Sequence, residues 1–158
     1  MTAAARLESA CWESRRHAAT LQLALADWDR LPTLPWADLE ANPALVRLLD
    51  QILYRFMKLQ DAVGERLLPA TLAVLLEPFE DWPMRDRLDR LERLGYLDTL
   101  QWLDWRGVRN RLAPEYPDAS ALRWAALHDA LAAARALLTC CDAWLSHLPA
   151  SPGPPPAG

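Results

Sequence analysis

The chain has 158 residues and is 52% hydrophobic, enough apolar material for the core of one domain without disulfides or a bound metal. Its formal net charge of −4 does not indicate nucleic-acid binding by overall electrostatics. Charged residues interrupt the N-terminal segment, and no stretch approaches the roughly 18 apolar residues of a membrane span, so we expect a soluble cytoplasmic protein without membrane contact.

The three cysteines do not predict a site. Cys140 and Cys141 are adjacent and Cys11 is distant, which matches neither a disulfide framework nor the paired spacing of a zinc site. We expect them to be small buried apolar residues, and we expect neither a metal nor another cofactor.

The apolar spacing is helical along almost the whole chain. A first helix is predicted over about residues 4–29 and a second over about 43–68, separated by a break at 31–36 that holds two prolines. Pro69 is expected to kink or restart the chain before a short apolar segment at 70–76.

Three further helices are predicted in the second half. The first covers 84–94 and ends at Gly95, and the next begins at Asp98 with a capping-box pattern and ends near Leu112. Pro114 cannot continue that helix, and Asp118 can cap the last one, over about 119–148.

These elements predict an all-α fold, an up-and-down bundle of four to five helices. Residues 1–148 are expected to form a single domain, and residues 149–158 a disordered proline-rich tail. Eight tryptophans are more than one narrow bundle core should hold, which favours a homodimer.

The candidate binding residues lie on the helix that begins at Asp98. Arg106 and Arg109 are three residues apart and share a face, with Trp105 in the preceding turn. Arginine beside an aromatic ring can bind a phosphate with an adjoining base, so these residues are candidates for RNA or nucleotide binding. The alternative is structural: the arginines cover the tryptophan rings and pair with Asp104 or Glu115.

The following residues carry a recognisable motif with one departure. Arg109, the polar Asn110 and Tyr116 fit the pattern R-x4-H-x-Y, but Pro114 stands where the pattern has histidine. The passage from Trp105 to Asp118 thereby resembles the "LRNxLAHEYPD" passage of the HEPN superfamily, in particular HepT-like proteins of MNT/HEPN toxin–antitoxin modules. The stretch Tyr54 to Pro69 also resembles the second helix of relatives of this group, and the likeness covers about residues 43–148.

The resemblance implies a HEPN-like metal-independent RNA endonuclease whose site lies in a cleft between two copies of the bundle. Arg109 and Asn110 would be its catalytic residues, with Arg109 stabilising the charge of the phosphorane. A histidine would carry the proton, and its loss costs about 10²- to 10⁴-fold in rate. The resemblance also implies an MNT-type nucleotidyltransferase partner that attaches AMP to Tyr116.

Few other groups are candidates to replace the histidine. His128 is expected beside the core seam of the last helix, and Asp61 or Glu65 on the second helix could face the cleft as ionised carboxylates. His17 and His147 are expected to be solvated.

Three functions follow from these observations. The first is a HepT-like toxin component with weak or lost cleavage. The second is a non-catalytic HEPN dimer that binds a nucleotidyltransferase or a nucleotide through the cleft of Arg106 and Arg109. The third is a helical scaffold whose tryptophans serve only dimer packing.

Overall fold

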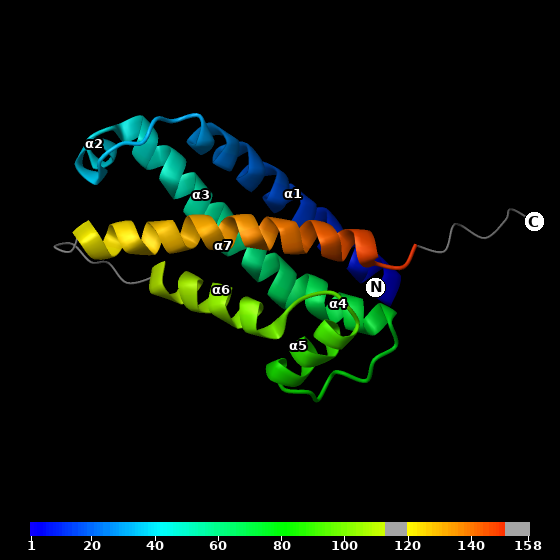
Figure 1. The fold of residues 1–158 in the computed structure, drawn as a ribbon. Helices are drawn as coiled ribbons and strands as arrows, with labels where there is room; N and C mark the ends of the chain where they lie inside the picture. Colours follow the sequence, from blue (N-terminus) through cyan, green and yellow to red (C-terminus); the bar gives the residue numbers. More distant parts are fainter. Residues whose placement is uncertain (113–119, 151–158) are drawn as a thin grey trace, which may run out of the picture.

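The described residues, 1–112 and 120–150 of a computed structural model, form helices and no strand, which confirms the all-α class (Figure 1). The elements in chain order are α1 (Ala3–Asp29), α2 (Trp36–Glu40), α3 (Pro43–Asp61), η1 (Ala62–Leu67), α4 (Leu68–Val74), α5 (Met84–Arg93), α6 (Thr99–Leu112) and α7 (Ser120–His147). Within these residues, no helix combines the length and the apolar character that crossing a membrane requires.

Helices α1 and α3 lie against each other and carry one side of the core. Thr2 caps α1 by accepting a hydrogen bond from the backbone N–H of Ala5, and Asn42 caps α3 in the same way through Ala44. Pro43 occupies the first turn of α3, where its missing N–H costs nothing. Helix α1 begins and ends close to the predicted residues, whereas α3 begins where predicted but ends at Asp61, short of the predicted residue 68.

The short helix α2 was not predicted. The break at 31–36 returns to helix at Trp36, whose ring packs on Trp124 of α7 with centroids 5.3 Å apart. An ion pair between Glu40 and Arg123 joins the same two helices. The loop between α1 and α3 is therefore folded back onto the start of α7, as Figure 1 shows.

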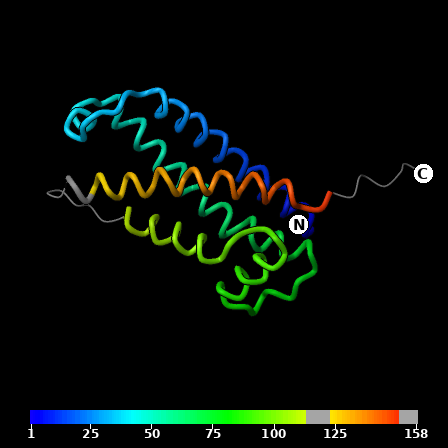
Figure 2. Tube along the Cα trace, in the orientation of Figure 1, coloured from blue at the N-terminus to red at the C-terminus, as the bar shows by residue number. Residues whose placement is uncertain are grey.

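Helix α3 continues through the π-helical segment η1 into α4 without leaving the helical path (Figure 2). Pro69 lies in the first turn of α4, so the chain restarts its α-helical pattern there, as predicted, but after a π segment that was not predicted. Gly64 in the middle of η1 lies under Trp102 of α6, because a Cβ on Gly64 would come within 2.9 Å of Cζ2 of that ring. This contact fixes how closely α6 approaches η1.

The corner between α5 and α6 forms as predicted. Gly95 follows the end of α5 with a φ of 86°, a backbone conformation that favours glycine. Asp98 then accepts a hydrogen bond from the backbone N–H of Gln101 at 2.9 Å and caps α6.

Helix α7 crosses the pair formed by α1 and α3 and runs antiparallel to α6 (Figures 1 and 2). Trp144 on α7 is fully buried, and its indole N–H donates to the hydroxyl of Thr71 in α4 at 3.0 Å. The Thr71 hydroxyl in turn donates to the carbonyl of Leu67 at 2.7 Å. A polar pair inside the core thus joins α7 to α4 with its hydrogen bonds satisfied.

Nearly all of the tryptophans are covered within a single copy of the chain, so their number does not by itself indicate a homodimer. Trp102, Trp105 and Trp144 are buried, and among the eight tryptophans Trp12 alone is exposed, at 62% of its surface. The others are partly covered by their own chain, as Trp36 and Trp124 cover each other. The bundle therefore accommodates nearly all of its tryptophans without a second copy.

Gly64→Ala should destabilise the protein by about 1–2 kcal/mol. Alanine favours a helix by up to about 1 kcal/mol over glycine, but overpacking a core typically costs about 1–3 kcal/mol, and the buried Trp102 has little room to move. Urea denaturation measures the change. The partly exposed Gly107, whose Cβ would meet only the flexible end of Arg111, provides the control, since Gly107→Ala should be neutral or stabilising. Equal effects of the two substitutions would contradict this account of the Gly64 contact.

Candidate functional site

The candidate residues lie on the last two turns of α6. One face of this helix is in the core through Trp102, Trp105 and Val108, which are buried at spacings of three. Arg109 lies at the margin of that face, whereas Arg106 and Asn110 are exposed beside it. The end of α6 therefore presents the partly buried Arg109 and two exposed arginines, Arg106 and Arg111.

Arg109 is held by Asp61, the last residue of α3. Its Nη2 lies 3.0 Å from each of the two carboxylate oxygens, and the two side chains are 33% and 31% exposed. The Nε of Arg109 is buried and has no hydrogen-bond partner among the described residues. Asp61 therefore offsets the charge of Arg109, while the Nε donor lies inside the protein without an acceptor.

The structure gives Arg109 a carboxylate partner that the sequence analysis did not name for it. Its carboxylate partner is Asp61, 48 residues away, and not Asp104 on the same helix. Asp61 thus faces α6, as considered from the sequence, while Glu65 is exposed and lines a different groove with Arg6 and Phe79.

Trp105 contributes to packing on this side of α6. Its ring is 5% exposed and meets Trp102 edge to face, with centroids 6.3 Å apart. Such burial leaves little ring surface for a stacked base. Of the three predicted binding residues, Arg106 alone is exposed.

The rest of the motif lies outside the described residues. This applies to Pro114 and Tyr116, and also to Glu115 and the predicted cap Asp118. The proposed modification of Tyr116 therefore stays a prediction from the sequence.

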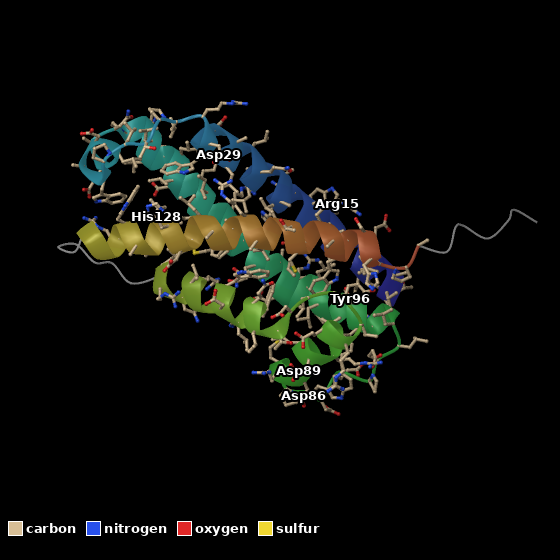
Figure 3. All side chains as sticks on the ribbon, in the orientation of Figure 1. Arg15, Asp29, Asp86, Asp89, Tyr96 and His128 are labelled. Carbon is tan, nitrogen blue, oxygen red and sulfur yellow. The ribbon has the colours of Figure 1, made fainter. Side chains whose placement is uncertain are left out.

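None of the hydrogen bonds and ion pairs within the described residues joins a histidine to Arg109 or Asp61. His128 is exposed near the start of α7, where its ring lies 4.3 Å from that of Trp124 (Figure 3). His147 was expected to be solvated; it is exposed, but its Nε2 lies 2.9 Å from the carbonyl oxygen of Leu94. The described histidines thus have their contacts elsewhere in the fold.

The expectation that His17 is solvated was wrong. Its side chain is 13% exposed, and Arg55 on α3 donates a hydrogen bond to its Nδ1 at 2.9 Å. Burial, followed by the charge of Arg55, lowers the pKa of His17 below its ordinary value of 6.5. His17 is therefore a neutral acceptor at pH 7.

The cysteines behave as the sequence predicts. Cys11 and Cys141 are buried, and burial raises the pKa of Cys140 to about 11 and that of Cys141 to about 12. These thiols stay protonated at neutral pH and are poor nucleophiles. Within the described residues, no group of three or more His, Cys, Asp or Glu side chains could hold a metal ion.

No family model matches the chain, and neither a curated protein nor a solved structure matches it. The HEPN resemblance therefore stays a prediction that rests on the residues of the motif and of the second helix.

The pair of Arg109 and Asp61 should stabilise the fold measurably. Asp61→Asn leaves a partly buried guanidinium without its carboxylate and should lower the free energy of unfolding by about 1 kcal/mol, between the values of exposed and buried pairs. A double-mutant cycle with Arg109→Gln, followed by urea denaturation, should give a coupling of about 0.5–1 kcal/mol. Asp50→Asn, at an exposed position of α3, is the matched control. Additive effects of the Asp61 and Arg109 substitutions would argue against the pair.

Proposed function

We propose that this chain is a HepT-like HEPN protein whose ancestral RNA-cleaving site has become a binding site with weak or lost cleavage. The observation that carries the proposal is a motif that lacks its proton carrier and whose arginine is paired with a carboxylate. The proton carrier of the motif is replaced by Pro114, and the guanidinium of Arg109 is offset by Asp61 at 3.0 Å.

Cleavage by attack of a ribose 2′-OH on the adjacent phosphate needs two groups. One titrates near neutrality and moves a proton, and the other is a fixed cation that stabilises the phosphorane. Proline has no ionisable group, and a cation beside a carboxylate gives the phosphorane a weaker field. The missing proton carrier and the paired arginine both reduce catalysis more than they reduce binding.

Binding of a phosphate remains feasible at the end of α6. Arg106 and Asn110 are exposed, four residues apart on one side of the helix. These groups suit a phosphorylated ligand, either RNA or the nucleotide of a partner.

The proposal includes a homodimer and an MNT-type nucleotidyltransferase as partners. A cleft between two copies that contains Arg109 requires the outer side of α6 at the interface. That side carries Leu100, 70% exposed, and Leu103, 36% exposed, followed by Arg106 and Asn110. Exposed leucines beside the motif support an interface there. The proposal of a nucleotidyltransferase partner rests on Tyr116 and the motif alone.

The purified protein should cleave structured RNA slowly or not at all, and Pro114→His should raise the rate by about 10²- to 10⁴-fold if the missing proton carrier is the cause. Gel analysis of end-labelled RNA measures the rate. Arg109→Ala in the Pro114→His background should abolish the gain, and Arg30→Ala on the exposed end of α1 should not. Robust cleavage by the unaltered protein that depends on Arg109 would refute the loss of activity. No gain in any Pro114→His variant would remove the support for a nuclease ancestry.

Leu103→Asp should weaken the homodimer about tenfold or more, since it places a charge in the proposed interface. Size-exclusion chromatography with light scattering, over a range of protein concentrations, measures the mass. Leu23→Asp is the control, because Leu23 is 70% exposed on α1, away from α6. A monomeric unaltered protein, or equal effects of both substitutions, would contradict a dimer through α6.

A further inference from the structure

A second polar surface lies on the opposite side of α3 from the core, between α1 and α3. It is a groove of about 440 Å³, within the range of ligand sites. Helix α1 contributes Trp12 and Arg16, and α3 contributes Tyr54, Arg55 and Lys58. We call it the α1–α3 groove.

The groove holds an excess of positive charge in a chain of net charge −4. Its single carboxylate, Glu13, forms a close ion pair with Arg66, which also donates to the hydroxyl of Ser9 at 3.1 Å. Arg16, Arg55 and Lys58 have no carboxylate within 4.0 Å among the described residues, and Arg55 donates instead to the neutral ring of His17. Three cations are thus available to an anionic ligand.

The same groove holds exposed aromatic rings. Within residues 1–112 and 123–150, Trp12 and Tyr54 are the large aromatic side chains with exposed surfaces, at 62% and 49%. The guanidinium of Arg16 lies 5.6 Å from the ring centroid of Trp12. The cationic groups of Arg55 and Lys58 lie 5.5 and 5.8 Å from that of Tyr54.

Each cation therefore lies beside a ring that water still reaches. A buried indole would need no explanation, but an exposed Trp12 contributes little to folding. Rings that can stack on bases, beside cations that can contact phosphates, are the chemistry with which proteins bind single-stranded nucleic acids.

We propose that the α1–α3 groove binds single-stranded nucleic acid, with a base stacked on Trp12 or Tyr54 and the backbone phosphate contacted by Arg16, Arg55 and Lys58. The groove lies on α1 and α3 and uses none of the residues at the end of α6. It therefore stands apart from the proposed function, and RNA cleavage is not needed for it.

Fluorescence anisotropy with a short labelled single-stranded RNA of mixed sequence tests the stacking contact. Trp12→Ala should weaken binding about tenfold or more, since stacking on an aromatic side chain typically contributes that much per base. Leu23→Ala removes an exposed apolar side chain from the same helix and should leave binding unchanged. A duplex of the same sequence should bind more weakly, because its bases are already stacked.

The salt dependence tests the phosphate contacts. Arg16→Ala with Lys58→Ala should lower the slope of log affinity against log salt by about 1.4, that is, about 0.7 for each phosphate that the variant no longer neutralises. Arg30→Ala with Arg93→Ala removes the same charge from other exposed positions and should change the slope little. Equal slopes for the two double variants would overturn the proposal.

Two competitors define the ligand. A mononucleotide that displaces the RNA at similar affinity would show that one nucleotide is the whole ligand. That result would overturn the proposal that the groove binds a nucleic-acid strand. Binding to phosphatidylserine vesicles that depends on Trp12 and Arg16, without RNA binding, would also overturn the proposal. The ligand of the groove would then be an anionic membrane surface. Circular dichroism melting of each variant checks that it is folded, so that a loss of RNA affinity is not caused by unfolding.

Discussion

The packing of Trp102 onto Gly64 is the contact on which the candidate site depends. A ring can come this close to a helix only where the helix has no side chain, and Gly64 provides that point in the middle of η1. The wider π turns lie directly after Asp61, at the end of α3. π segments occur often at functional sites, where they shift the residues beside them. Here α6 approaches closely at Gly64, and Asp61, which directly precedes the π segment, lies within hydrogen-bond distance of Arg109.

The two polar surfaces differ in how their cations are used. At the end of α6 a carboxylate on a neighbouring helix takes up the charge of Arg109, and the position of that arginine is fixed. In the α1–α3 groove the carboxylate pairs with Arg66, and the other cations lie over rings. A fixed and neutralised arginine suits recognition of one geometry. Available cations beside aromatic rings tolerate many sequences, because each base has a face that can stack.

Much of the fold could be predicted from the sequence, because its helix ends carry local signals. Gly95 and Asp98 act through their own backbone neighbourhood, and each forms the expected turn or cap. Helix α2 was missed because its five residues are too few to show a period. The π segment was missed because the apolar residues before and within it follow helical spacing.

Sites that join distant segments were harder to predict. Helical spacing places Arg109 on a face of α6 but does not say that Asp61, rather than Asp104, lies opposite. Likewise the four-residue spacing of Trp12 and Arg16, and of Tyr54 and Lys58, can be read from the sequence. That these two pairs line one groove depends on the packing of α1 against α3.

The hydrogen bond of Trp144 to Thr71 has a consequence for the position of α7. A slip of α7 by one turn, about 5.4 Å, along its own axis would carry Trp144 away from Thr71. A hydrogen bond is directional, and such a slip would leave a buried indole N–H without an acceptor. One threonine hydroxyl thus helps to set the axial register of a helix of 28 residues, together with the contacts of Trp124 and Arg123 at its other end.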